Sequence, residues 1–201
     1  LLALADRLHK TREKAAAGFE KHILSTLAKL GMPDTLFRIA LTPLAEPGRT
    51  GCDSVQFLFT ANRNMTPQPV ERIASGGELS RIMLAIRTVT ANQDDIGTLI
   101  FDEIDAGISG RTAQKVSEKL KLLSKSHQIL CITHLAQIAA MADTHFEICK
   151  AASEGSTATS IRRLNREQTV EELARLLGGA KITDTVIQNA REMKELADKT
   201  K

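Results

Sequence analysis

Residues 98–110 read TLIFDEIDAGISG, and this stretch decides the fold class of the chain. The run from Thr98 to Phe101 predicts a short buried strand that ends in two adjacent carboxylates, Asp102 and Glu103. Ligands of open α/β sheets bind beyond the carboxyl ends of the strands, so both carboxylates fall where chemistry is expected. One of them can hold Mg²⁺ while the other orients or deprotonates an attacking water. A solvated acidic loop is the alternative that the stretch alone leaves open.

A second apolar strand, over residues 128–133, ends with Thr133 and His134. Strands that are apolar on both faces and alternate with helices indicate a largely parallel sheet. If the two strands are neighbours, His134 and Glu103 lie at one sheet edge, where His134 would contact a terminal phosphate. A histidine that serves only the local structure is the alternative.

The third feature is SGGELSR, residues 75–81, which stands at the start of a strongly periodic helix predicted over residues 77–92. Two glycines let backbone N–H groups approach an anion, and the start of a helix adds a partial positive charge. Ser75 supplies a hydroxyl donor, so the segment predicts a phosphate site. A serine that only caps the helix is the other interpretation.

The rest of the chain completes a mixed α/β pattern. A hairpin is expected before the glycine motif, because residues 37–41 and 55–59 alternate in hydrophobicity on either side of a turn-rich loop. The remaining predicted elements are helices over residues 111–124, 135–141, 167–177 and 184–199, and strands over residues 144–150 and 158–164. We therefore expect an α/β fold with a mostly parallel sheet flanked by helices.

Residues 1–30 predict one helix, in which the apolar spacing of Leu1, Leu4 and Leu8 later shifts phase. This pattern indicates the end of a coiled coil that becomes a packed helix, and a plain amphipathic helix fits it equally well. The same residues hold six Lys or Arg and three acids, whereas the other 171 residues are balanced in charge. Because the chain begins with Leu, we expect it to be a fragment.

The composition argues against several classes of protein. Apolar residues make up 42% and charged residues 25% of the 201 residues, as in ordinary globular domains. No run of eighteen apolar residues is present to span a membrane, and nothing resembles a secretion leader. The cysteines, Cys52, Cys131 and Cys149, lack the spacing of a zinc or disulfide framework. We expect Cys131 to be a buried thiol in a reducing, cytoplasmic compartment.

The order of the three features resembles the SMC-like family of ABC-type ATPases, and within it the members that act in DNA repair. The resemblance covers the chain from end to end and implies the C-terminal half of an ATPase head. It rests on IASGGELSR at 73–81, FDEIDAGISG at 101–110, ITHL at 132–135, ELARLLGG at 172–179 and LGMP at 30–33.

The resemblance implies a role for each matching residue, and ATP and Mg²⁺ as the bound groups. Asp102 resembles the carboxylate associated with Mg²⁺, Glu103 the glutamate that activates water, and His134 the histidine that senses the γ-phosphate. The residues that resemble the ABC signature and the D-loop, which meet ATP held by a second head, are Ser75, Gly76, Gly77, Glu78, Asp105 and Gly107. Phosphoryl transfer depends on positioning and charge compensation, which suits this set.

One element of the family pattern is missing, because no Walker A sequence, G-x-x-x-x-G-K-[ST], occurs in the chain. In this family that element lies in an N-terminal lobe, separated from the C-terminal half by a long coiled coil. The resemblance therefore implies that residues 1–30 are the end of the coiled-coil stalk. Residues 31–201 are then the C-terminal half of the head, which we expect to be inactive by itself.

These expectations predict an ATP-hydrolysing protein of DNA double-strand break repair and recombination, located in the cytoplasm with the nucleoid. The expected partners are its own Walker A lobe, a second head and DNA, with no membrane. Three alternatives stay open: another SMC-like chromosome-maintenance ATPase, an ABC transporter ATPase, and a non-catalytic dimerisation module. Ile104 weighs against the transporter, because transporters usually place proline after the Asp-Glu pair.

Overall fold

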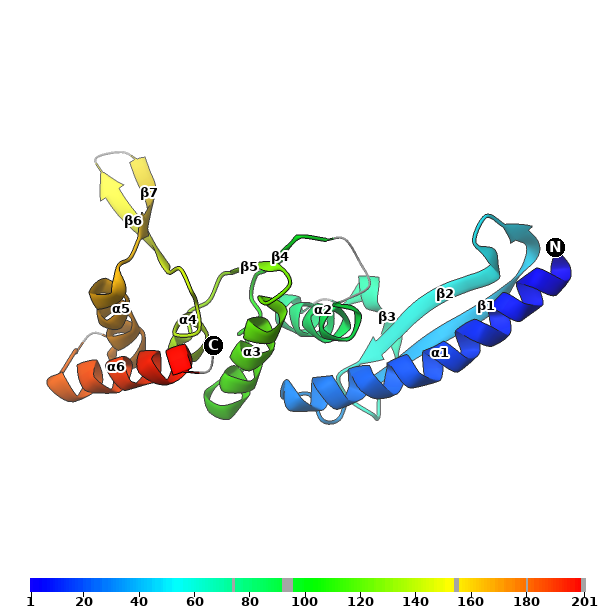
Figure 1. Ribbon diagram of the computed structural model, residues 1–201, viewed down its shortest axis with the longest axis horizontal. Coiled ribbons are helices and arrows are strands. Elements are labelled where there is room, and N and C mark those ends of the chain that lie inside the picture. Colours follow the sequence, from blue (N-terminus) through cyan, green and yellow to red (C-terminus); the bar gives the residue numbers. More distant parts are fainter. Residues whose placement is uncertain (74, 92–95, 154–155, 180, 200–201) are drawn as a thin grey trace. The chain divides into compact units, whose positions relative to one another are not determined.

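The computed structural model describes residues 1–73, 75–91, 96–153, 156–179 and 181–199 (Figure 1). Ala74, within the quoted glycine motif, and Asn92, the expected end of the following helix, lie outside the described residues. The chain divides into two compact units, and each is described by itself. The first unit comprises Leu1–Gly107 and Ser126–Cys131, and the second comprises Ile108–Lys125 and Ile132–Lys201.

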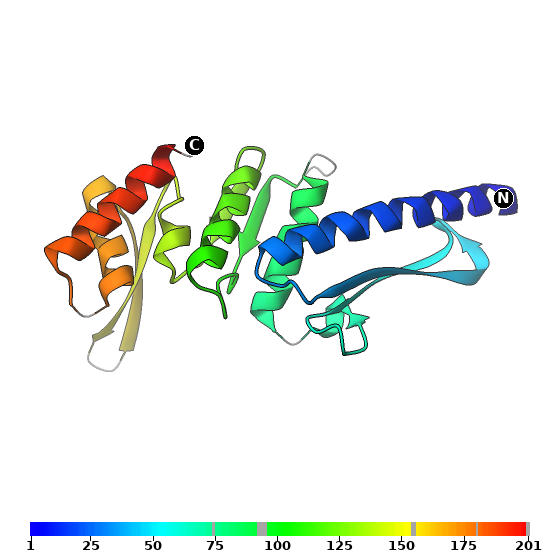
Figure 2. The ribbon, with the colours of Figure 1, turned by 90° about the horizontal axis from the view of Figure 1, so that it is seen from below.

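The first unit begins with a long helix that lies along a β-hairpin (Figures 1 and 2). The helix is α1 (Leu2–Lys29), and the hairpin consists of β1 (Leu36–Gly48) and β2 (Gly51–Thr60). The two strands are antiparallel, and the short strand β3 (Gln68–Pro69) extends the sheet before the 3₁₀ helix η1 (Val70–Arg72). The predicted helix and hairpin are confirmed.

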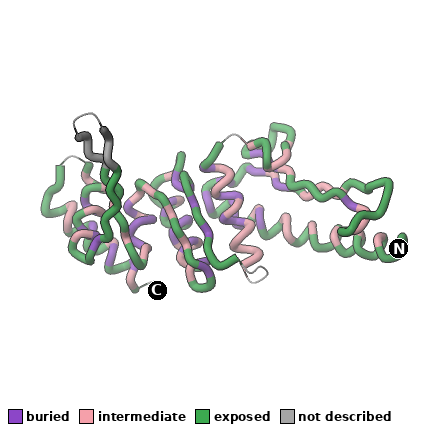
Figure 3. Tube along the Cα trace, turned by 90° about the horizontal axis from the view of Figure 1, so that it is seen from above, coloured by how far each residue is buried: buried purple, intermediate pink, exposed green. Residues whose placement is uncertain are grey.

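The two halves of α1 differ in how they pack (Figure 3). Towards its C-terminal end, Ile23 and Leu27 are fully buried, and Phe57 of β2 stacks between Phe19 and Phe37 with ring centroids 6.4 and 5.9 Å apart. In the N-terminal half the leucine side chains are exposed. The phase shift in the sequence therefore marks where packing on the hairpin begins.

A charged cluster holds the N-terminal half of α1 to the hairpin. The buried carboxylate of Asp53 on β2 lies 2.6 Å from His9 Nδ1 and accepts a 2.9 Å hydrogen bond from Arg12. Arg12 also donates to the carbonyl oxygen of Thr50, at 2.7 Å. The helix is thus fixed to the tip region of the hairpin by polar contacts where apolar contacts are few.

The remainder of the first unit carries the predicted motifs. Helix α2 (Gly76–Thr90) precedes strand β4 (Thr98–Phe101), which pairs in parallel with β5 (Gln128–Cys131). The expectation that these strands are buried on both faces is wrong for the described residues. Leu99 and Phe101 are buried, but Ile100 on the opposite face is 68% exposed, because no described element covers that face.

The second unit has an alanine-rich core formed by its helices, the last two of which lie side by side (Figure 2). Its elements are α3 (Gly110–Leu123), α4 (Ala136–Ala139), β6 (Phe146–Ser153), β7 (Ser156–Arg163), α5 (Arg166–Gly178) and α6 (Asp184–Lys199). A reciprocal capping box between Asn165 and Gln168 begins α5. The mixed α/β class is confirmed. Among the described residues β4–β5 is the parallel pair, whereas β1–β3 and β6–β7 are antiparallel.

Candidate functional site

The two carboxylates predicted to carry the chemistry follow β4 directly, on an exposed turn. The backbone of Glu103 has a φ of 56°, in the left-handed region that non-glycine residues rarely adopt. The amide of Ala106 donates a 3.0 Å hydrogen bond to the carbonyl oxygen of Glu103 and closes the turn. A left-handed conformation costs about 1–2 kcal/mol, so the surrounding contacts must hold Glu103 in place.

The start of α2 lies against this turn. A Cβ added to Gly76 would collide with the Glu103 carboxylate, and one added to Gly77 would lie 2.8 Å from Ala106 Cβ and 3.1 Å from the Glu103 carbonyl oxygen. The structure therefore brings together two motifs that the sequence separates by more than twenty residues. The glycines make room for the chain's own turn, a reason for glycine that the sequence argument did not foresee.

Ser75 is the N-cap of α2, since its Oγ accepts a hydrogen bond from the Glu78 amide at 3.4 Å. This is the capping arrangement that the sequence left open beside a phosphate-binding role. Ser75 is exposed and its hydroxyl proton can still be donated, so the cap and a bound phosphate are chemically compatible.

Two polar side chains of α2 also hydrogen-bond to backbone carbonyl oxygens of the turn. Ser80 Oγ donates a 2.6 Å hydrogen bond to the carbonyl oxygen of Asp102. The Arg81 guanidinium donates to the carbonyl oxygen of Ala106 at 2.8 Å and reaches that of Ile104 at 3.5 Å. Burial lowers the pKa of Arg81, and the nearby charge of Glu78 acts against that shift.

Sequence reasoning missed Arg81. The signal was present, because residues 77, 81, 84 and 85 form one helical face and Arg81 is its charged member. A charged residue on an apolar helix face indicates that a polar partner lies opposite it. Here the partners are backbone carbonyls of another segment, which no side-chain pattern reveals.

Cys131, at the end of β5, stands opposite Phe101 in the parallel pair and is half-buried. Burial, together with the nearby carboxylates of Asp105 and Asp102, raises the pKa of its thiol to about 12. The thiol therefore stays protonated and is a poor nucleophile or metal ligand. The expected buried thiol is only half-buried in the structure.

Two of the other predicted residues, Asp105 and Gly107, follow Glu103 in the first unit. Asp105 is buried, and Gly107 has a φ of 72°, which favours glycine there. His134 is exposed and lies in the second unit, beside Thr133, whose Oγ1 accepts a hydrogen bond from the Leu135 amide at 3.1 Å. The shared sheet edge of His134 and Glu103 stays a prediction.

No group of three His, Cys, Asp or Glu side chains that could hold a metal ion is found in the described parts of the chain. Mg²⁺ does not need such a cage, because it takes one or two carboxylates and completes its shell with water and substrate phosphates. The Asp102 carboxylate, which is exposed and directly follows β4, fits that donor set.

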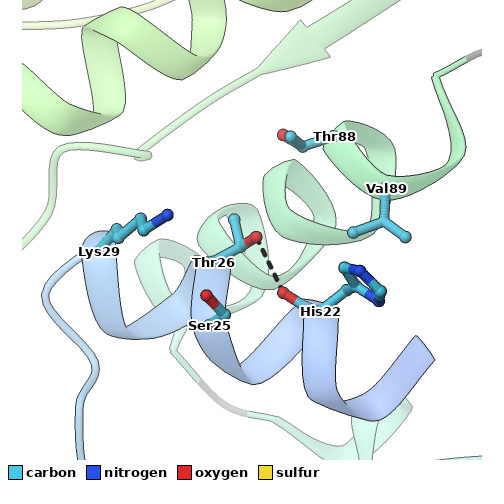
Figure 4. A pocket seen from close by; sticks show the side chains of 6 residues that line it. All are labelled: His22, Ser25, Thr26, Lys29, Thr88 and Val89. Atoms are coloured by element: carbon cyan, nitrogen blue, oxygen red, sulfur yellow. Dashed lines mark hydrogen bonds between the residues drawn. The ribbon is translucent and has the colours of Figure 1, made fainter. Parts of the chain in front are cut away.

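A shallow hollow lies away from these motifs, between the C-terminal parts of α1 and α2 (Figure 4). Its lining side chains are His22, Ser25, Thr26, Lys29, Thr88 and Val89. None of them is a predicted site residue. Across the described residues, no helix has both the length and the apolar character needed to cross a membrane.

Comparison with known sequences gives one consistent group of relatives. The chain is 42% identical over 193 residues to the DNA repair protein RecN of Vibrio cholerae, which covers 96% of the chain and 35% of that protein. It is 39% identical over 203 residues to the Bacillus subtilis protein of the same name, covering 98% of the chain and 34% of that protein. The chain thus spans about a third of the length of these relatives. No family model matches the chain.

Comparison with solved structures agrees on the fold. A head domain of Smc with coiled coil and joint, from Pyrococcus yayanosii, matches 81% of the chain and 29% of that structure, with 23% identity and a TM-score of 0.55. A Smc head domain with an extended coiled coil, from Pyrococcus furiosus, matches 83% of the chain and 39% of that structure, with 22% identity and a TM-score of 0.52. The fold is that of part of an Smc-type head.

Proposed function

Over nearly all of its length this chain belongs to the family of the RecN proteins, of which it spans about a third, and from that premise we propose that it is the C-terminal part of an SMC-like DNA repair ATPase. The observation that carries the proposal is the packing of Gly76 and Gly77 against the Asp102–Glu103 turn. This contact joins a helix start suited to phosphate with carboxylates suited to activating water. The relatives' name favours DNA repair over the transporter and dimerisation alternatives.

Each residue has a defined part in the proposal. Asp102 would hold Mg²⁺, which supplies charge neutralisation at the phosphate oxygens. Glu103 accepts a proton from the attacking water, and its exposed carboxylate on a held turn suits that role. His134 contacts the γ-phosphate. The residues that would meet ATP bound to a second head are Ser75, Gly76, Gly77, Glu78, Asp105 and Gly107.

The proposed partners follow from what the chain lacks. Hydrolysis of ATP needs a phosphate cradle with a lysine, which a separate Walker A lobe of the complete protein would supply. A second head would complete the site, and DNA would be the substrate of the whole assembly. A DNA repair protein works where the chromosome lies, so the proposed location is the bacterial cytoplasm, with the nucleoid.

The test is Glu103→Gln in the complete protein, with the exposed Glu46→Gln as the matched control. Glutamine keeps the size of the side chain but cannot accept the proton. We expect ATP hydrolysis to fall about a hundredfold or more, with ATP binding retained and the ATP-bound head dimer accumulating. Near-normal turnover by Glu103→Gln, measured beside Glu46→Gln, would remove Glu103 as the base.

A further inference from the structure

Arg81 is a charged side chain in a place where an apolar one would be expected. It is only 7% exposed and shares its helix face with Leu84 and Ala85, which are fully buried. Within the described residues, its Nε is buried and has no hydrogen-bond partner. A buried charge with incomplete hydrogen bonding costs free energy, and an apolar residue of similar size is often at least as stable. Fold stability alone therefore does not explain an arginine here.

The contacts of Arg81 suggest what it does instead. Its guanidinium reaches the carbonyl oxygens of Ala106 and Ile104, on alternate residues of the same turn, at 2.8 and 3.5 Å. Both bonds come from one nitrogen, Nη1, whose two N–H groups are fixed in the guanidinium plane, whereas a lysine ammonium rotates on a flexible stem. We therefore expect arginine to hold this turn more firmly than lysine would.

The neighbouring residue completes the hold. Ser80 binds the carbonyl oxygen of Asp102 at 2.6 Å, at the start of the turn, and Arg81 binds its end. Between these two points lies Glu103, with its left-handed backbone and its carboxylate against Gly76. Residues 76–81 of α2 therefore contact the turn at both ends and in the middle. The turn cannot shift along the helix without breaking these bonds.

We propose that Arg81 is a positioning residue that holds the Asp102–Ala106 turn in register on α2, so that movement of the start of α2 is passed to Glu103. The inference rests on the proposed function, in which the start of α2 meets ATP bound to a second head. When the second head binds, the Glu103 carboxylate then moves together with the start of α2. Arg81 links the two movements without contacting ATP.

The test uses the complete protein with Arg81→Met, Arg81→Lys and, as the matched control, Arg38→Met, an exposed arginine on β1. Hydrogen exchange is followed in the peptide covering residues 102–107, which contains the Ala106 amide. Steady-state ATP hydrolysis and thermal unfolding are measured on the same samples. We expect Arg81→Met to speed exchange in this peptide about tenfold and to lower kcat about tenfold to a hundredfold, with KM for ATP changed less than about twofold. Arg81→Lys should be intermediate.

Wild-type exchange and wild-type kcat in folded Arg81→Met would overturn the proposal. So would a parallel loss of kcat and exchange protection across all peptides, since that pattern reports a structural role only. If Arg81→Met does not fold, Arg81→Lys decides: wild-type exchange at residues 102–107 in that variant would refute the need for N–H donors fixed in the guanidinium plane. A failure of the proposed function is distinguishable, because it would leave the wild type without hydrolysis while the exchange comparison still reports the hold.

Discussion

Gly77 illustrates how much of the site depends on a single atom. A methyl group at this position would stand 2.8 Å from Ala106 Cβ and 3.1 and 3.2 Å from two carbonyl oxygens of the turn. These neighbours are backbone atoms or a short side chain, so they cannot rotate away. The absence of a side chain at Gly77 is therefore part of how Glu103 is held.

We predict that Gly77→Ala destabilises the chain by about 1–3 kcal/mol, because the turn must move away from α2 to admit the methyl group. Gly18→Ala is the matched control, since no atom lies within 4 Å of the added Cβ in the middle of α1. That change should stabilise the chain by up to about 1 kcal/mol through helix propensity. Urea unfolding of both variants checks this. Equal effects of the same sign would contradict the close packing at Gly77.

The sequence drew attention to Asp102, Glu103 and the glycines separately, because strand ends and helix starts have recognisable patterns, and their roles in a site stay a prediction. It did not reveal the left-handed backbone of Glu103 or the role of Arg81. Both depend on which turn packs against which helix. That is a property of tertiary contacts, and no local preference of the residues encodes it.

Helix α1 is held in two different ways along its length. Aromatic and aliphatic packing fixes the C-terminal half, whereas the N-terminal half depends on Asp53, His9 and Arg12. The hydrogen bond from Arg12, and then that from His9, lower the pKa of Asp53, while Asp53 raises the pKa of His9. We therefore expect the attachment of this half of α1 to depend on pH.

We predict that His9→Gln loses more stability at about pH 5.5 than at about pH 8.5. The pKa of His9 is raised from 6.5, so its contribution is complete below 6.5 and is lost as the pH rises through the raised value. The pKa of Asp53 is lowered from 3.8, so its contribution is present above 3.8 and is lost as the pH falls through the lowered value. Urea unfolding at both pH values measures the difference.

His22→Gln serves as the control, because the His22 ring bonds the carbonyl oxygen of Gly18 within the same helix. A loss for His9→Gln that is identical at the two pH values would show that the imidazole contributes packing alone.

Most elements could be predicted from hydrophobic periodicity, and β4 was predicted with its observed bounds. The hairpin strands extend further than predicted, to Gly48 and from Gly51, because antiparallel backbone pairing continues beyond the apolar residues. The exposed face of β4 was not foreseen. An apolar run shows that burial is favoured, but it does not show which segment provides the cover.

Taken as a whole, the chain carries the residues that we propose form one side of an ATP site. It carries the signature-like helix start and the carboxylates, but its sequence contains no Walker A loop. The lysine and the glycine-rich cradle supply much of the phosphate binding in P-loop enzymes. The relatives, which are about three times as long, have room for the missing part.

We therefore predict that the chain by itself neither binds ATP at micromolar concentration nor hydrolyses it. Isothermal calorimetry with Mg²⁺ and ATP should give no saturating heat, and phosphate release should match the buffer. The complete protein measured alongside is the control. Saturable micromolar binding by the isolated chain would mean that the described residues hold nucleotide without the cradle.

The exposed face of β4 and β5, which carries Ile100 and Leu130, has a consequence for how the chain behaves in a cell. Ile100 and Leu130 expose apolar surface beside strand edges whose backbone groups can pair with another chain. Copies of the chain in which no other segment covers this face would tend to aggregate as their concentration rises. Chaperones and proteases recognise such surfaces, so an unaccompanied chain would be a target for quality control, and its abundance would track how promptly that face is hidden after synthesis.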